Sequence, residues 1–272
     1  MSAGAGVGHR PWALYGYAVF FLAFLYGPVL LLPLFSINDS TQIAFPIRSF
    51  TLRWYRELAQ DQQLVVAFGH SVSVALVVCL ITTALGVASG WALTRHRLPG
   101  SRSIIGFMML PLVVPGLILG VSLLMVMGQL GIELSLLTVA IGHMVLCLPF
   151  SLAVMMSCFE GFDRSLEEAS RDLGEGMFAT FLRVVLPNAL PAVISSLLMT
   201  FTISFDEFVL SFFLSGSQVT LPVYMWAQLR FPVKLPSVLA LATLILLSSC
   251  LLIGVAESLR RMGRENREGA VP

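Results

Sequence analysis

Charged residues are scarce in this sequence, and their scarcity excludes a water-soluble domain. Of the 272 residues only 11% are charged, whereas 57% are hydrophobic. In soluble domains roughly a quarter of all residues are charged, so this chain could not cover a water-exposed surface. The net charge is +1, and a balance so close to neutrality gives no reason to expect a nucleic-acid partner.

Recognisable catalytic and metal-binding motifs are missing as well. The sequence has no GxxxxGK[ST], so it cannot hydrolyse ATP through a recognisable P-loop, and it has neither HExxH nor GxSxG. Its four cysteines all lie in or beside apolar runs and form no CxxC, so neither a zinc site nor a disulfide framework is indicated. We therefore expect no catalytic residue, no metal ligand and no cofactor bound by this chain.

Long apolar runs are what the sequence has instead. A bilayer is crossed by roughly 20 residues of helix, and six runs are long enough: 13–36, 66–94, 104–128, 134–158, 188–212 and 237–258. The first run exceeds the apolar core of a signal peptide, about 7–15 residues, so we interpret it as a span. The sequence predicts an all-α polytopic membrane protein with six transmembrane helices.

The distribution of basic residues predicts the orientation of these spans. With the N-terminus inside, most arginines fall in inner segments: Arg10, Arg95, Arg97, Arg102, Arg164, Arg171, Arg183, Arg260, Arg261, Arg264 and Arg267. The outer segments hold only Arg48, Arg53, Arg56, Arg230 and Lys234. Because basic residues are enriched on the cytoplasmic side, both termini and the loop 160–187 are predicted to be cytoplasmic.

The longest charged interval between apolar runs is Ser165–Pro187, SLEEASRDLGEGMFATFLRVVLP. Ser165 and Glu168 have the spacing of a capping box, and Gly174 falls where a helix takes a left-handed residue. These signals predict a short helix at about Leu166–Leu173. Because eight residues do not form a stable helix alone in water, this helix must dock on its own spans or on a partner.

A second, amphipathic helix is predicted after Gly174. Phe178, Phe181, Leu182 and Val185 have the i, i+3, i+4, i+7 spacing of one helical face. Pro187 and Pro191 then predict a break before the next span, because proline is tolerated in the first turn of a new helix.

Two adjacent carboxylates interrupt the fifth apolar run, in Ser204-Phe205-Asp206-Glu207. An ionised Asp costs at least about 2.5 kcal/mol at the centre of a span. Two interpretations stay open: a satisfied structural pair, or a polar face on a solute path. His70 and His143, also in apolar runs, are interpreted as hydrogen-bonded structural residues rather than as ligands.

Glycine and aromatic patterns give three further predictions. Gly86 and Gly90 form a GxxxG spacing, which permits close approach of helices. Pro111, Pro115, Gly116 and Gly120 indicate a broken third span. In the first outer loop Leu52–Ala59 predicts a short interfacial helix with Trp54 and Tyr55 at headgroup depth, and the alternative is a docking ledge for an external partner.

The charged loop resembles the EAA loop of permease subunits of binding-protein-dependent (MetI-like) ABC importers. That pattern is EAA, three residues, Gly, nine residues and then I-x-L-P. The matching residues are Glu168-Ala169-Ser170, Gly174 and Val184-x-Leu186-Pro187. Ser170 replaces the second alanine and Val184 replaces isoleucine.

The resemblance extends to other segments. Phe50–Leu58 and Ala92–Arg95 are similar to segments of the same permease family. Phe201–Glu207 closely resembles the spermidine/putrescine-type subfamily, and in particular the second, C-like, of its two permeases. His70, Ser237 and Leu239 depart from that subfamily's pattern. Iron, thiamine, phosphonates, opines and amino-acid derivatives therefore stay open as solutes beside a small cation such as a polyamine.

The family resemblance implies the type I ABC importer permease fold in the bacterial inner membrane. It implies cytoplasmic segments at 1–12 and 259–272, a first transmembrane helix at 13–36, a periplasmic loop at 37–63 and a core domain at 64–258. It implies an ATPase subunit dimer that uses ATP and Mg, a second permease subunit, with a heterodimer favoured over a homodimer, and a periplasmic solute-binding protein. This chain would be a transport subunit and not an enzyme.

The resemblance also assigns candidate site residues. Those expected to couple the chain to the ATPase are Glu167, Glu168, Ala169, Ser170, Asp172, Leu173, Gly174, Leu186 and Pro187. Those expected on the substrate path are Asp206, Glu207, Ser204, Phe205 and Pro115. Acids outnumber bases across 160–183, so we expect basic residues in the ATPase groove.

Two rival classes fit less well. A secondary transporter would need internal repeats with paired broken helices, and no convincing repeat relates the two halves of the chain. A membrane enzyme would need a nucleophile, metal ligands or acid pairs in a reachable cluster, for which Asp206 and Glu207 alone are too little.

Overall fold

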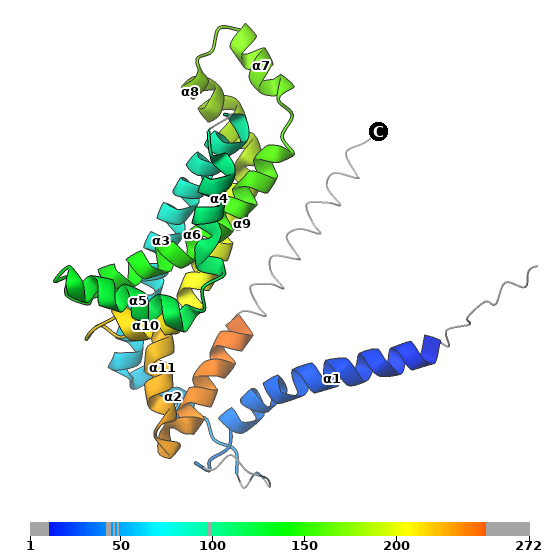
Figure 1. The fold of residues 1–272 in the computed structure, drawn as a ribbon. Coiled ribbons are helices and arrows are strands. Elements are labelled where there is room, and N and C mark those ends of the chain that lie inside the picture. Colours follow the sequence, from blue (N-terminus) through cyan, green and yellow to red (C-terminus); the bar gives the residue numbers. More distant parts are fainter. Residues whose placement is uncertain (1–10, 42–44, 46, 48, 97–98, 249–272) are drawn as a thin grey trace, which may run out of the picture. The chain divides into compact units, whose positions relative to one another are not determined.

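The computed structural model describes residues 11–41, 45, 47, 49–96 and 99–248 (Figure 1). Their regular structure is helical, apart from one isolated antiparallel bridge between Asn38 and Phe50. The chain divides into two compact units, one formed by 62–225 and the other by 1–61 with 226–272.

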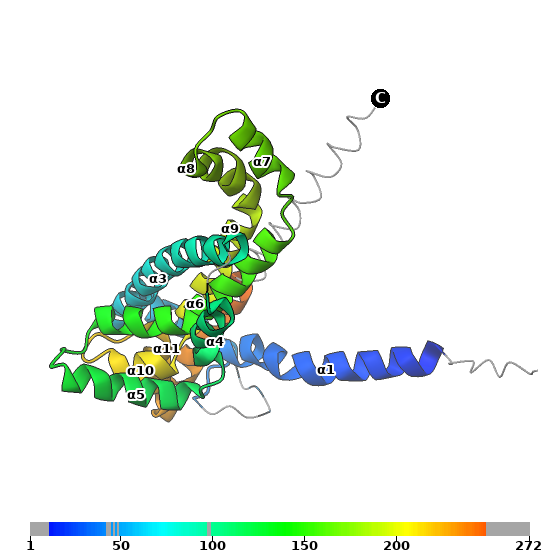
Figure 2. The same cartoon turned by 45° about the horizontal axis from the view of Figure 1, so that its top comes forward.

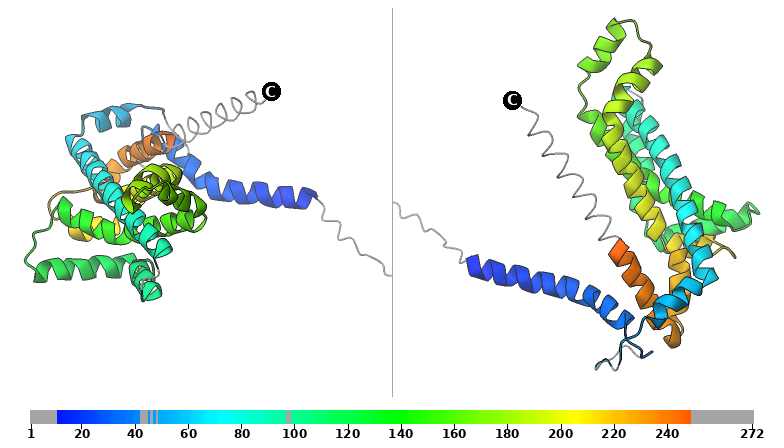
Figure 3. Two further views of the ribbon diagram at one scale, coloured as in Figure 1. Left: turned by 90° about the horizontal axis from the view of Figure 1, so that it is seen from above. Right: turned by 180° about the vertical axis from the view of Figure 1, so that it is seen from behind.

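Three long helices form the centre of the 62–225 unit: α3 (Gln62–Arg95), α6 (Leu136–Glu160) and α9 (Leu186–Asp206). They lie side by side (Figures 1 and 3). The GxxxG prediction is confirmed, because a Cβ atom on Gly86 would lie 2.0 Å from Ser151 Oγ and one on Gly90 would lie 3.0 Å from Met155 Cβ. Glycine at these positions lets α3 approach α6 closely.

A chain of buried hydroxyl groups joins the same three helices. Ser196 Oγ lies 2.8 Å from Ser151 Oγ and 3.1 Å from Thr83 Oγ1. Lipid offers no hydrogen-bond partner, so polar groups at this depth must pair within the protein. These hydroxyls fix the mutual register of α3, α6 and α9.

The third predicted span is not one straight helix. It consists of α4 (Ser101–Met109), the 3-10 turn η1 (Leu110–Leu112) and α5 (Gly116–Gln129), with a bend of 101° between the two arms. Pro111 and Pro115 explain the bend, because proline lacks an N–H group and disfavours a helical residue before it. Within the described residues four helices are long and apolar enough to cross a membrane, or five if this bent pair counts as one span.

From Met177 onward the chain is helical without the predicted break. α7 (Ser165–Asp172) is followed by α8 (Met177–Thr180), the π-helical turn η2 (Phe181–Val185) and α9. Met177–Asp206 is one continuous helical span, so the break predicted at Pro187 is wrong. The π-turn explains the continuity, since a wider turn relieves the clash between a proline ring and the carbonyl four residues earlier.

Two short helices complete this part of the chain, α10 (Val209–Leu214) and α11 (Leu221–Leu229). α10 lies beside α5 (Figures 1 and 2), and a Cβ atom on Gly120 would lie 2.8 Å from Phe213 Cδ2. His70 Nδ1 lies 2.9 Å from the carbonyl oxygen of Val219. This contact confirms that His70 is a hydrogen-bonded structural residue.

The other unit contains α1 (Pro11–Ser36), α2 (Arg53–Gln60), the 3-10 turn η3 (Pro232–Lys234) and the helix that continues from it to Ser248. Trp54 on α2 is only 3% exposed, and its Nε1 donates to the carbonyl oxygen of Asn38 at 2.7 Å. The prediction that Trp54 is an interfacial anchor is therefore wrong, because the ring is used to close the loop between α1 and α2. Residues 1–10, the tail 259–272 and the last part of the predicted sixth span lie outside the described residues.

Candidate functional site

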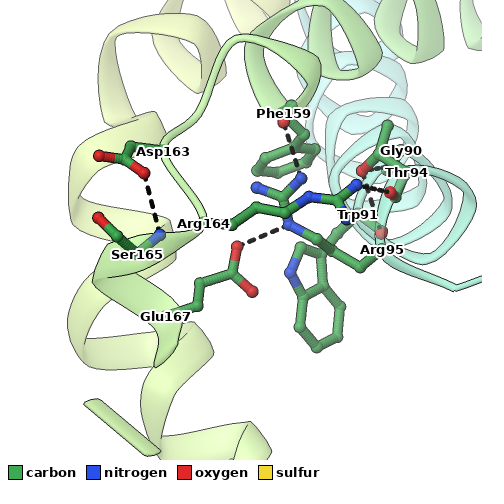
Figure 4. Close-up of polar contacts among 9 residues, drawn as sticks. All are labelled: Gly90, Trp91, Thr94, Arg95, Phe159, Asp163, Arg164, Ser165 and Glu167. Atoms are coloured by element: carbon green, nitrogen blue, oxygen red, sulfur yellow. Dashed lines mark hydrogen bonds and ion pairs between the residues drawn. The ribbon is translucent and has the colours of Figure 1, made fainter. Parts of the chain in front are cut away.

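The N-terminus of α7 is held by Asp163 rather than by the predicted capping box. The helix begins one residue earlier than predicted, so Ser165 lies in its first turn and makes no side-chain cap. Asp163 Oδ1 accepts a hydrogen bond from the Ser165 N–H at 2.9 Å (Figure 4). This hydrogen bond stabilises the carboxylate and lowers the pKa of Asp163 below its ordinary value.

The C-terminus of α7 closes on Gly174, as predicted. Gly174 has φ +88°, a left-handed conformation that residues with a side chain rarely adopt. Its N–H donates to the Arg171 carbonyl at 2.9 Å, and the Glu175 N–H donates to the Ser170 carbonyl at 3.2 Å. These two bonds are a Schellman motif, which stops the helix sharply.

One face of α7 is turned toward its own chain. Glu167 is buried and accepts a hydrogen bond from Arg95 Nε at 2.6 Å (Figure 4). Ser170, also buried, has its hydroxyl 3.1 Å from the Thr180 hydroxyl on α8. Glu167 and Ser170 thus fasten the helix from within.

The opposite face of α7 is open. Leu166, Ala169 and Leu173 have a spacing of three and four residues and are all exposed, with Leu173 86% exposed. Glu168 and Asp172, four residues apart, are exposed beside them. The candidate coupling residues of α7 therefore divide between a face that is packed against the chain and a face that is open to a partner.

The last two candidates of this loop lie farther along the chain. Leu186 packs, half-buried, against the cluster that contains Phe159 and Val185, whereas Pro187 is exposed. Both residues belong to the junction of the π-turn and α9.

The acid pair lies at the break between α9 and α10. Asp206 is the last residue of α9, and Glu207 is extended with ψ 109°. Glu207 Oε1 accepts a hydrogen bond from the Leu210 N–H at 3.1 Å, so it caps the next helix. Asp206 is exposed and makes no ion pair or hydrogen bond with the part of the chain that the structure describes. The two carboxylates therefore have different surroundings.

His143 on α6 bridges this break. Its Nδ1 lies 2.9 Å from Ser204 Oγ at the end of α9, and its Nε2 lies 3.1 Å from Ser211 Oγ in α10. The ring is only 1% exposed. The apolar run around His143 predicts a hydrogen-bonded histidine but not its partners, because they are 61 and 68 residues away in the chain.

The remaining path candidates, Ser204, Phe205 and Pro115, have different surroundings. Ser204 is buried against His143, and Phe205 makes an edge-to-face contact with Phe68 at 6.0 Å between ring centroids. Pro115 is exposed at the start of α5. Nowhere in the described ranges do three His, Cys, Asp or Glu side chains come close enough to hold a metal ion.

Most of this sequence matches a known family. Residues 82–262 match the family described as the binding-protein-dependent transport system inner membrane component. The chain belongs to this family. It is accordingly a permease subunit of an ABC importer and not an enzyme, and ATP is hydrolysed by a separate subunit.

Curated relatives cover most of this permease. It is 31% identical over 257 residues to the spermidine/putrescine transport system permease protein PotC of Escherichia coli K12, covering 94% of this chain and 97% of PotC. It is 35% identical over 231 residues to the putrescine transport system permease protein PotI of the same strain, covering 82% of each chain.

Solved structures share its fold. A bacterial ABC transporter involved in the import of the acidic polysaccharide alginate matches with a TM-score of 0.69 and 18% identity, covering 96% of this chain and 99% of the other. The inward-facing MetNI methionine ABC transporter matches with a TM-score of 0.58 and 18% identity, covering 74% and 95%. The predicted all-α, type I ABC importer permease fold is confirmed.

The His143 bridge gives a stability prediction. His143→Ala should lower the free energy of unfolding by about 1–3 kcal/mol for each hydroxyl that it leaves buried and unpaired. His143→Gln should cost less, because its amide still reaches one of the two serines. Thermal unfolding in detergent measures both, and equal stability of His143→Ala and the wild type would contradict the bridge.

Proposed function

We propose that this permease moves a small cation, of the polyamine class, and that α7 is the helix through which an ATPase subunit drives it. The observation that carries the proposal is the division of α7 into two faces. One face is fastened to the chain by Glu167 and Ser170, while the other exposes leucines to water. Exposed leucines on an eight-residue helix favour a protein partner that covers them.

The chemistry of the open face describes the groove that would receive it. Leu166, Ala169 and Leu173 require an apolar floor, and Glu168 and Asp172 require basic residues at its edge. Two other charges of the loop are already neutralised, since Glu167 pairs with Arg95 and Glu175 pairs with Arg183. The ATPase dimer would bind ATP and Mg, and this chain would bind neither.

Further partners follow from the sequence. A sister permease in a heterodimer is favoured because Phe201–Glu207 resembles the second of two paired permeases. A periplasmic solute-binding protein would meet the outer loops, and lipid would surround the apolar helices. The excess of arginine in the inner segments supports a cytoplasmic position for both termini.

Asp206 supports a cationic solute. Its carboxylate is exposed at the end of an apolar helix without a basic partner among the described residues. Attraction between opposite charges is stronger there than in water, so the site favours a cation and disfavours an anionic phosphonate. The relatives PotC and PotI are named for spermidine and putrescine transport. Iron, thiamine, opines and amino-acid derivatives are the alternative solutes.

The coupling role predicts the behaviour of two glycine variants. Gly174→Val should insert into the membrane but lose ATP-driven uptake by roughly tenfold or more, because valine is strongly disfavoured at φ +88° and the end of α7 must unwind. Gly176→Val is the matched control, since Gly176 has φ −72° and open space around it. Uptake by membrane vesicles measures both, and normal uptake by Gly174→Val would refute the coupling role.

The solute proposal predicts different effects for the two acids. Asp206→Asn should reduce uptake of labelled putrescine by roughly tenfold or more, with unchanged assembly with the ATPase. Glu207→Gln should retain most uptake, because its amide oxygen still caps α10. If Asp206→Asn takes up putrescine like the wild type while Glu207→Gln does not, the roles of the two acids are assigned wrongly.

A further inference from the structure

Arg95, the last residue of α3, contacts two other helices with one guanidinium group. Its Nε donates to Glu167 Oε1 on α7 at 2.6 Å, and its Nη1 donates to the carbonyl oxygen of Phe159 at 2.9 Å (Figure 4). Phe159 is next to last in α6, where carbonyl groups have no partner within the helix. Arg95 thus ties the ends of α3 and α6 to α7.

Residues that precede and follow α7 also contact the end of α3. Arg164 Nη2 donates to the Thr94 carbonyl at 3.1 Å, and the Arg95 guanidinium lies 5.8 Å from the centre of the Phe162 ring. The ring centroid of Trp91, one turn before Arg95, lies 4.9 Å from the ring centroid of Phe181 in the π-turn. The chain on both sides of α7 is therefore packed against α3.

The Arg95–Glu167 ion pair is buried, which distinguishes it from the other ion pairs of the described residues. The two side chains are 8% and 6% exposed, whereas Arg183 in the pair with Glu175 is 71% exposed. A buried pair adds little net stability because both charges lose their water, but removing one partner leaves an uncompensated buried charge. Such a pair fixes a geometry strongly, and here the geometry is the position of α7.

The pair also has a spare donor. Arg95 Nη2 is buried and has no hydrogen-bond partner among the described residues. Nε and Nη2 lie on one edge of the guanidinium and together fit the two oxygens of a carboxylate. Glu167 uses one of its oxygens, so its carboxylate can tilt from one hydrogen bond to two without leaving Arg95.

We infer that the Arg95–Glu167 pair is the link through which movement of α7 is transmitted to α3 and α6. Arg95 and Glu167 are positioning residues, since they act on the spans and not on solute or ATP. The inference rests on the proposed coupling role of α7. It adds the step by which movement of α7 reaches the long helices α3 and α6. Lysine cannot replace Arg95 in this role, because a single ammonium does not present the same fork.

The test uses the whole transporter in lipid vesicles, with the cognate solute-binding protein purified together with the solute that it carries. Glu167→Gln and Arg95→Lys should assemble with the ATPase and lower its basal hydrolysis less than about twofold. Stimulation of hydrolysis by the loaded binding protein should fall by roughly tenfold or more. Arg95→Glu combined with Glu167→Arg should restore part of the stimulation, and Glu175→Gln, which breaks an exposed pair, should keep it all.

Each alternative outcome is decisive. Normal stimulation in Glu167→Gln overturns the inference, and so does loss of assembly in every variant of the pair including the charge exchange, because the pair would then serve folding alone. If Gly174→Val uncouples while Glu167→Gln does not, the link is wrong and the coupling role of α7 stands. If neither variant uncouples, the coupling role itself is wrong.

Discussion

The absence of hydrogen-bond partners in lipid is the constraint on which the rest of this structure depends. Every polar group on an apolar helix must be satisfied within the protein. Ser151 and Ser196 meet between α6 and α9, His143 bridges two serines across the break after α9, and Glu207 caps the helix that follows. Asp206 departs from this rule, since it is exposed and has no such partner among the described residues.

At the ends of α3 and α6 the same constraint applies to a charged side chain, Arg95. Arg95 donates to a carbonyl oxygen at the end of α6 and neutralises Glu167, so three helices meet in one buried contact. α7 can then be short and still hold its place, although a helix of this length is unstable alone. Its outer face is left apolar and acidic for a partner. A force applied to that face reaches the spans through a contact that is costly to break.

Much of this architecture could be predicted from the sequence because it follows from local rules. The apolar runs, the left-handed Gly174 and the GxxxG contact of Gly86 depend on a few neighbouring residues. The capping box was wrong because Asp163 and Ser165 compete for the same helix start, and local spacing does not decide between them. The prediction of a break at Pro187 was wrong because the π-turn before it relieves the clash of the proline ring with the preceding turn. The partners of Glu167 and His143 could not be predicted, since each lies more than sixty residues away and depends on helix packing.

The central claim is that α7 and α3 move together because Arg95 and Glu167 join them. Spin labels at Arg171, exposed on α7, and at Leu85, exposed on α3, would report their distance in the assembled transporter. The account predicts one narrow distance distribution, the same with and without a non-hydrolysable ATP analogue, which broadens when Glu167 is replaced by Gln. A distance that changes with nucleotide in the wild type and is insensitive to Glu167→Gln would contradict it.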